Sequence, residues 1–365
     1  MVKTLTPIDH IRTRLGMYVP TDHANKPIDA AWSVLLHELV ADGVRAFASG
    51  DASRLEIRCC HETGEIAIGH DGPDGNLCHK LAAAFQEGSG TCMGGTYGSF
   101  WHESDKIKAA YVTRYDLMTY AILSALSKKM AVETYVDGEW RATVCSDGKI
   151  GAEERLLSGL IPTDARRFVW VRFIIDPKYI AEDKGRSPYS ADLLQEFGRS
   201  LAYACPGLLV VVNECEYMFP RGIEDMVEAR MATVGSETLM EPRMAESNGV
   251  AVACGIVQRR NGGRKITGAA FVNGREIKSH DVLVNLIESA GNCLLDCRSL
   301  RSRDYEFVFA ASVKMPIQSE DTSLPYVADI CSWTWHSNSG APDGISRYVT
   351  SFRRCLLKLL GGYMK

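Results

Sequence analysis

The chain has 365 residues, 46% of them hydrophobic and 24% charged, a composition typical of a globular protein long enough for two domains. A net charge of -4 with a pI near 6.2 excludes nucleic-acid binding through bulk charge, so any such contact needs a local basic patch. The start contains no apolar run of signal-peptide length, and no segment approaches the roughly 20 apolar residues of a membrane span, so we expect a cytoplasmic protein without membrane contact.

The twelve cysteines are scattered through the chain, apart from the adjacent Cys59 and Cys60 and the spaced pair Cys293 and Cys297. No CxxC pair is present, which argues against a zinc site. Small buried hydrophobic residues in a reducing compartment are the simpler interpretation.

The first half alternates helical and extended patterns. Hydrophobic periodicity predicts helices over 30–48 and 116–129, and strands over 54–61, 65–70, 130–138, 139–148 and 166–176. Asp137-Gly138 is a dipeptide typical of a tight hairpin turn between two of these strands. Helices layered on a sheet in this way indicate an α+β sandwich.

A second unit is expected after a boundary near residue 185, giving domains 1–185 and 186–365. Its predicted helices are 190–205, 222–231, 279–295 and 345–365, and its predicted strands are 207–214 and 306–316, with two more around a glycine turn in 249–274.

Six segments, in chain order, resemble landmarks of the ATPase region of bacterial gyrase B and of its topoisomerase IV counterpart. They are IDHIRTRLGMYV, HELVADGVRAF, the stretch 121–148, FVWVRFIIDP, GIEDMVEARM and ASVKMP. The resemblance implies a GHKL (Bergerat-type) α/β sandwich followed by a transducer domain of ribosomal-protein-S5-like fold. It implies neither a DNA-cleaving domain nor a tyrosine subunit within this chain.

The family's active-site helix corresponds to the segment around Glu38, which matches the general base that activates water. Asp42 stands where the family has an asparagine that binds Mg²⁺, and its carboxylate could bind Mg²⁺ only if a nucleotide is held. Arg45 replaces an aspartate of the family, which reverses a charge.

The family's adenine-binding pattern Asp-x-Gly-x-Gly corresponds to HDGPDG, in which His70 replaces the aspartate and Gly72 is retained. A neutral imidazole could accept one hydrogen bond there. A one-residue slip would bring in Asp71, but Gly72 and Gly75 would then fall at the wrong spacing. A plain hairpin turn is the alternative interpretation.

The family's phosphate-binding loop is rich in glycine, but the corresponding VTRYDLMTY has none. Arg114 and Leu117 would block close approach of the backbone to phosphate, and Asp116 would repel it. In the family, a lysine of the transducer domain reaches the terminal phosphate of ATP. After SVKMP this chain has no such lysine, and Glu320 and Asp321 lie near its expected place.

The sequence therefore predicts a degenerate ATP pocket with no cofactor required, or ATP and Mg²⁺ if hydrolysis survives. The favoured interpretation is a non-hydrolysing protein that acts on DNA or a type II topoisomerase subunit. A divergent ATP-hydrolysing module and a pocket for another ligand stay open. Members of the resembled family dimerise partly through an amino-terminal arm that crosses to the partner subunit. Because only seven residues precede IDHIRTR, exchange of such an arm should be curtailed here, although a homodimer through other surfaces stays open.

DNA contact is expected at QRRNGGRK, interpreted as a basic hairpin tip that could contact phosphates without reading the base sequence. A solvated hairpin end without a ligand is the alternative. The candidate contacts are Arg259, Arg260, Arg264 and Lys265.

Overall fold

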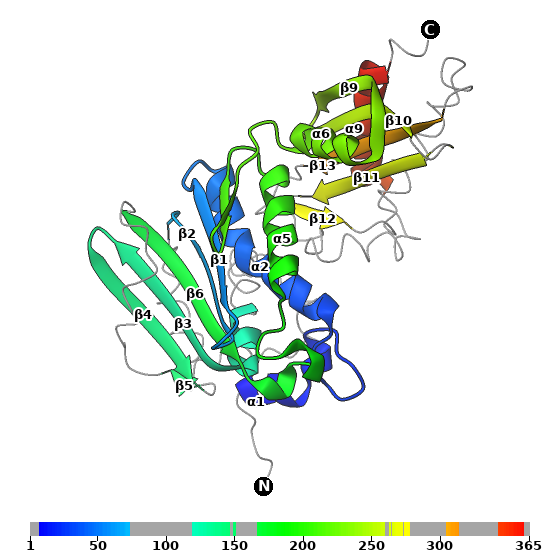
Figure 1. The fold of residues 1–365 in the computed structure, drawn as a ribbon. Coiled ribbons are helices and arrows are strands. Elements are labelled where there is room, and N and C mark those ends of the chain that lie inside the picture. The colour runs from blue at the N-terminus through cyan, green and yellow to red at the C-terminus, as the bar shows by residue number, and fades with distance from the viewer. Residues whose placement is uncertain are drawn as a thin grey trace. The chain divides into compact units, whose positions relative to one another are not determined.

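The computed structural model describes residues 7–73, 119–146, 149–150, 166–259, 263, 265–272, 274–277, 304–313 and 342–360. These residues form two compact units (Figure 1), the first made of residues 1–198 and 208–217, and the second of residues 199–207 and 218–365. Each unit combines a sheet with helices, so the expected α+β class is confirmed. Among the described residues no helix is long and apolar enough to cross a membrane.

The first unit contains an eight-stranded sheet of order β5-β4-β3-β6-β2-β1-β7-β8. Its strands are β1 (Arg54–Cys60), β2 (Glu65–His70), β3 (Ser127–Val136), β4 (Glu139–Ser146), β5 (Lys149–Ile150), β6 (Arg167–Ile175), β7 (Leu209–Val212) and β8 (Cys215–Tyr217). Its helices are α1 (Pro7–Thr13), α2 (Asp29–Ala48) and the first part of α5 (Ala191–Ala204), with short 3-10 turns at Leu15–Met17, Pro177–Tyr179 and Glu182–Lys184.

Strand β7 joins this sheet by pairing in parallel with β1, from Arg54 opposite Leu209 to Ile57 opposite Val212. Residues 209–217 were expected beyond a domain boundary at 185, yet they extend the first sheet. Helix α5 contributes to both units, because residues 191–198 belong to the first and 199–204 to the second.

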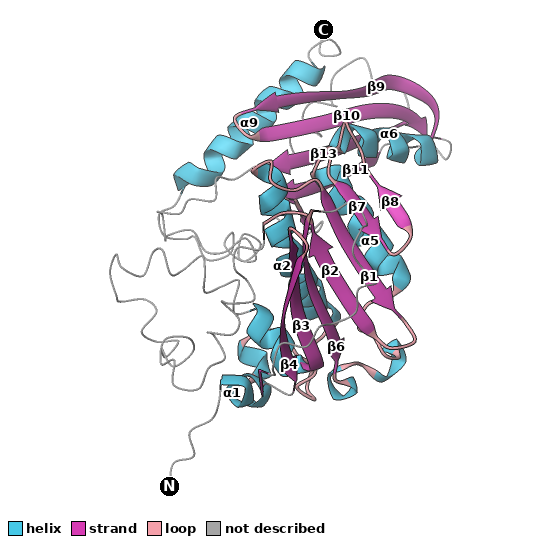
Figure 2. Ribbon diagram, turned by 90° about the vertical axis from the view of Figure 1, so that its left-hand side faces the viewer, coloured by secondary structure: helices cyan, strands magenta, loops and turns pink. Residues whose placement is uncertain are grey.

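Helices α2 and α5 cover one face of the first sheet and lie behind its strands in Figure 2. Gly43 of α2 approaches Leu55, and Gly198 of α5 approaches Val210 and Val212. Leu55 stands opposite both His70 and Val210 in the strand register, so these side chains share the helix-covered face.

The segment before β3 differs from its predicted form. Residues 119–126 are helical, but the helix ends where β3 begins at Ser127 rather than at residue 129. Ser127 pairs with Ile175 of β6, and the carbonyl of Leu126 accepts a hydrogen bond from Asp176. Pairing with a distant strand therefore overrides the local helical pattern.

The second unit contains a five-stranded sheet of order β12-β11-β13-β10-β9. Its elements are α6 (Ile223–Val234), β9 (Gly235–Ser247), β10 (Val250–Arg259), β11 (Lys265–Val272), β12 (Arg275–Ile277), β13 (Tyr305–Val313) and α9 (Pro342–Leu360). The buried side of α9, including Leu356 and Leu359, packs on the sheet face that carries Val252 and Ile256. Helix α6 lies on the other face, where Met231 fills the space above Gly255.

The predicted hairpin at QRRNGGRK is wrong. Strand β13 lies between β10 and β11, pairing antiparallel with β10 and in parallel with β11. A strand from residues 305–313 thus separates two strands that are neighbours in sequence. The expected helix over 279–295 lies outside the described residues.

Candidate functional site

The candidate site is built on α2, where Glu38 and Asp42 lie one helical turn apart and both are half-buried. Glycine at position 43 lets the helix approach β2 closely. A Cβ added to Gly43 would lie 3.1 Å from the Cβ of His70 and 2.9 Å from a methyl carbon of Leu55. The helix and the end of β2 therefore bring Asp42 and His70 into one region.

Both carboxylate oxygens of Asp42 accept hydrogen bonds from side chains. Arg45, three residues later on α2, donates to Oδ1 and forms an ion pair, and the hydroxyl of Tyr120 donates to Oδ2 at 3.2 Å. The Asp42 and Arg45 side chains are each 31% exposed, so the pair lies at the edge of the site. Sequence reasoning noted the reversed charge at Arg45 but missed Tyr120, because residues 78 positions apart give no local signal.

His70 is the last residue of β2 and is 8% exposed. Its Nδ1 accepts a hydrogen bond from the backbone N–H of Gly72 at 3.1 Å. Burial lowers the pKa of His70 below its ordinary 6.5, although the carboxylates of Asp42 and Asp71 act in the opposite direction. The imidazole is therefore neutral near pH 7, and its one acceptor nitrogen is used within the chain.

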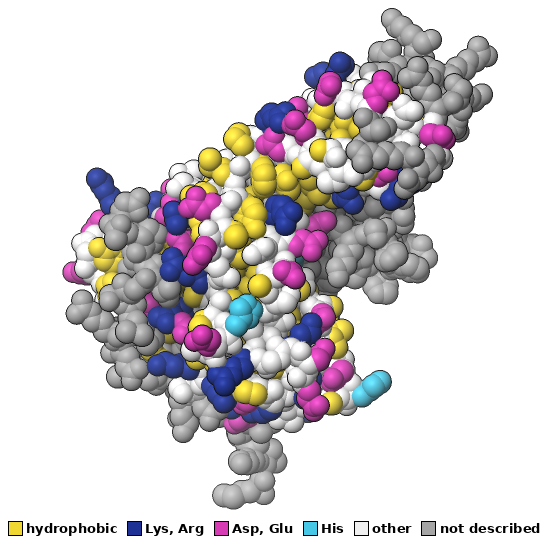
Figure 3. Space-filling view, viewed as in Figure 1, with side chains coloured by type: hydrophobic (Ala, Val, Ile, Leu, Met, Phe, Trp, Pro, Cys, Tyr) yellow, Lys and Arg dark blue, Asp and Glu magenta, His cyan; other side chains and the backbone are white. Residues whose placement is uncertain are grey.

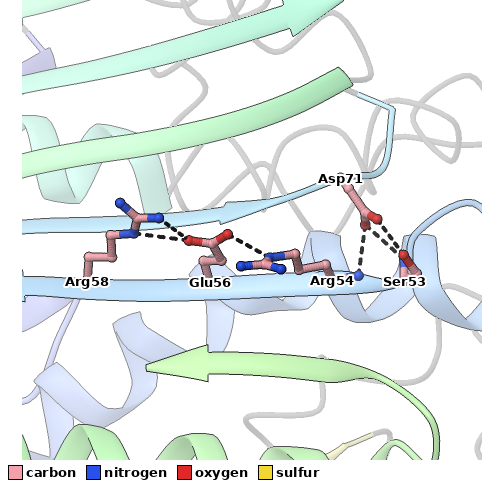
Figure 4. Close-up of polar contacts among 5 residues, drawn as sticks. All are labelled: Ser53, Arg54, Glu56, Arg58 and Asp71. Carbon is pink, nitrogen blue, oxygen red and sulfur yellow. Dashed lines mark hydrogen bonds and ion pairs between the residues drawn. The ribbon is translucent and has the colours of Figure 1, made fainter. Parts of the chain in front are cut away.

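Asp71 secures the loop that precedes β1. Its carboxylate accepts hydrogen bonds from the backbone N–H of Ser53 (2.8 Å), the hydroxyl of Ser53 (2.6 Å) and the backbone N–H of Arg54 (2.9 Å), as Figure 4 shows. Burial raises the pKa of Asp71, but these hydrogen bonds outweigh burial, so the net pKa is below 3.8. The structure thus gives this carboxylate a strong local role in holding two strands together.

Gly72 is buried against the end of α2, and an added Cβ would lie 2.7 Å from the Cβ of Ala46. This close approach explains why glycine follows the His-Asp pair. Gly75 lies outside the described residues, as do Arg114, Asp116 and Leu117 of the segment matched to the phosphate loop, and Glu320 and Asp321.

The sheet face opposite the helices carries a network of buried charges that the sequence did not indicate. Glu56, with a fully buried side chain, accepts hydrogen bonds from Arg54 (2.7 Å) and Arg58 (2.6 Å), as Figure 4 shows. On the neighbouring strands Arg172 donates to Glu133 (3.0 Å) and to Glu65 (2.6 Å).

Glu133 is incompletely satisfied by the residues that the structure describes, since its Oε2 is buried and has no hydrogen-bond partner among them. Burial raises the pKa of Glu133 above 4.5 despite the opposing charge of Arg172. Trp170, which stands opposite Glu133 in the strand register, likewise has a buried Nε1 with no hydrogen-bond partner within the described part of the chain.

Arg259 and Lys265, two of the candidate DNA contacts, lie on strands that do not pair with each other. The half-buried Arg259 ends β10, and its Nε lies 3.6 Å from a carboxylate oxygen of Glu306, whereas Lys265 begins β11 and is exposed. Arg260 and Arg264 lie outside the described residues. On the face shown in Figure 3, basic and acidic side chains are interspersed over the described surface.

Within the described residues, no three His, Cys, Asp or Glu side chains converge as a group that could hold a metal ion. Asp42, the candidate Mg²⁺ ligand, therefore belongs to no such group of three within this part of the chain.

Comparison with known proteins gives one curated relative in sequence and many relatives in structure. No family model matches the chain. The sequence is 25% identical over 233 residues to the B-subunit of DNA topoisomerase 4 from Borreliella burgdorferi, which covers 62% of this chain and 34% of that protein. The matched stretch thus spans about a third of the curated relative.

The structural likeness extends over nearly the whole chain. The B-subunit of DNA gyrase from Myxococcus xanthus matches with a TM-score of 0.60 at 16% identity, covering 98% of this chain and 94% of that one. The 43K ATPase domain of Thermus thermophilus gyrase B matches with a TM-score of 0.59 at 14% identity, covering 98% and 91%. The topoisomerase IV ATP-binding domain of Francisella tularensis gives 0.50 at 15% identity, covering 99% of each chain.

These matches confirm the expected fold class, because single solved chains of gyrase B type cover both units in order. Together with the sequence likeness to a topoisomerase IV subunit, they show that the chain has a gyrase-B-like fold.

Proposed function

We propose that this chain is a gyrase-B-like binding protein that does not hydrolyse ATP and acts on DNA or on a type II topoisomerase. The observation that carries the proposal is the polar arrangement on α2, where Arg45 and Tyr120 occupy both oxygens of Asp42. Phosphoryl transfer depends on positioning a metal ion and phosphates, and these side chains are arranged for contact with each other instead.

Two further features support the proposal. The buried His70 uses its acceptor nitrogen on Gly72, so a neutral ring presents a donor where the family presents a carboxylate. The segment matched to the phosphate loop contains no glycine. The gyrase-B-like fold is nevertheless retained over both units, which favours a role that depends on surfaces.

The test is a supercoiling assay in which this protein is added to purified DNA gyrase, with heat-unfolded protein as the control. We expect a change in gyrase activity at stoichiometric excess, and we expect the Glu38→Ala variant to act like the parent because no turnover is required. Unchanged gyrase activity, or ATP turnover that Glu38→Ala abolishes, would contradict the proposal.

A contact with DNA would be local, and Lys265 is the described cation best placed for it because it is exposed at the start of β11. Loss of one phosphate contact should reduce the slope of log affinity against log salt by about 1. Fluorescence anisotropy of labelled duplex DNA can compare Lys265→Ala with Lys128→Ala, which removes a lysine that is likewise exposed near the start of a strand, β3, in the first unit. Equal slopes for both variants would remove Lys265 from the proposed contact.

The second candidate function is a divergent ATP-hydrolysing module, for which the half-buried Glu38 on α2 is the supporting observation. A carboxylate one turn before Asp42 remains suited to activating water. Phosphate release from ATP by the parent protein, removed by Glu38→Gln, would favour this candidate over the first.

A further inference from the structure

The Asp42 carboxylate is held by two donors from different parts of the chain. Arg45 follows it by three residues on α2, a spacing that places both side chains on the same side of the helix. Tyr120 comes from the helical residues 119–126 and reaches Oδ2 at 3.2 Å. The carboxylate is thus fixed from both sides.

Magnesium does not fit this arrangement. Mg²⁺ demands oxygen ligands in near-octahedral geometry at about 2.0–2.1 Å and binds carboxylates that are free to approach it. Here Oδ1 accepts from a guanidinium, whose charge is permanent, and Oδ2 accepts from a phenol. A divalent cation at Asp42 would have to share an oxygen with one of these donors and would lie close to the positive charge of Arg45.

We infer that Asp42 is not a metal ligand in this protein and that the guanidinium of Arg45 provides the fixed positive charge of the site in place of a divalent cation. Any anionic ligand held on this helix is then bound without metal. The inference rests on the proposed function in taking α2 as the ligand site. It goes further by assigning the positive charge of that site to the guanidinium of Arg45.

The role of Asp42 follows from this inference. Its carboxylate orients Arg45 and neutralises part of its charge, so Asp42 is a positioning residue. Arg45 also acts on His70, because its charge helps to lower the pKa of that ring. Arg45 is therefore the positively charged member of the site, and the imidazole is neutral near pH 7.

Water-proton relaxation in the presence of Mn²⁺ tests the inference, because Mn²⁺ prefers the same oxygen ligands as Mg²⁺ and relaxes water more strongly once bound to a macromolecule. We would measure the enhancement of the water-proton relaxation rate with Mn²⁺ alone and with Mn²⁺ plus a non-hydrolysable ATP analogue, for the parent protein and for Asp42→Ala, which has no side-chain oxygen to bind a cation. The expected result is the same enhancement for both proteins in both conditions. An enhancement in the parent that Asp42→Ala removes would overturn the inference.

A gain-of-binding variant tests the cause. The double change Arg45→Gln and Tyr120→Phe removes both donors and leaves the Asp42 carboxylate open to a cation. We expect it to gain a Mn²⁺ enhancement that a third change, Asp42→Ala, removes again. Circular dichroism checks folding, and absence of the gain in a folded double variant would overturn the role assigned to Arg45 and Tyr120. If that variant does not fold, the comparison of the parent with Asp42→Ala still decides the inference.

These results are independent of those that test the proposed function. A metal bound at Asp42 would contradict the inference and leave the effect on gyrase standing. An unchanged supercoiling reaction would contradict the proposed function and leave the metal-free site standing.

Discussion

The Nδ1 atom of His70 accepts a hydrogen bond from the backbone N–H of Gly72, 3.1 Å away. A neutral imidazole has one acceptor nitrogen, so this bond assigns the proton to Nε2. The ring is therefore a donor toward any other partner. This reverses the direction of the hydrogen bond that the sequence alone suggested for it.

Stability should depend on pH through His70. Burial lowers the folded-state pKa below 6.5, so just below pH 6.5 the unfolded chain binds more protons than the native chain. The free energy of unfolding should then fall as pH drops from 6.5 toward the folded pKa, by at most about 1.4 kcal/mol per pH unit for one proton. Urea unfolding of the parent and of His70→Asn at several pH values measures the difference, and parallel curves would contradict the assignment.

Asp71→Ala should destabilise the first unit by about 1–3 kcal/mol, because it leaves the donors on Ser53 and Arg54 without their carboxylate. Asp71→Asn keeps one acceptor oxygen and should lose less. Urea denaturation followed by circular dichroism gives both free energies. Equal and negligible losses would show that these hydrogen bonds contribute nothing to the loop before β1.

Glu133 should make the free energy of unfolding depend on pH in the direction opposite to that expected for His70. Its folded pKa is raised above 4.5, so between 4.5 and that pKa the native chain binds more protons than the unfolded chain. The unfolding free energy therefore falls as pH rises through this window, again by at most about 1.4 kcal/mol per pH unit. Glu133→Gln keeps an oxygen for Arg172 and should flatten the dependence. A variant with the slope of the parent would show that Glu133 does not cause it.

Two adjacent leucines of α9 offer a matched comparison in the second unit. Leu356 is fully buried against the sheet, whereas Leu357 is 48% exposed. Leu356→Ala should cost about 2–5 kcal/mol through lost burial and a cavity, and Leu357→Ala should stay within about 0.5 kcal/mol of the parent. Thermal unfolding measures both, and similar losses would contradict the packing of α9.

The sequence determined the features of this protein that depend on near neighbours. The expected helix over 30–48 is α2 at Asp29–Ala48, and the Asp137-Gly138 turn joins β3 and β4 with positive φ angles of 50° and 92°. Such elements follow from side-chain periodicity and from the backbone conformations that turn residues tolerate. The same local pattern located Glu38 and Asp42 one turn apart.

Only the tertiary structure decided which distant segments meet. Strand β13 separates β10 from β11, β7 extends the first sheet beside β1, and Tyr120 reaches Asp42 across 78 positions. Partners of this kind are selected by burial and strand pairing over the whole chain, and no local period records them. For this reason helix α2 and the spacing of Glu38 and Asp42 on it could be predicted from the sequence, whereas the hydrogen bonds to both oxygens of Asp42 and the proton position on His70 could not.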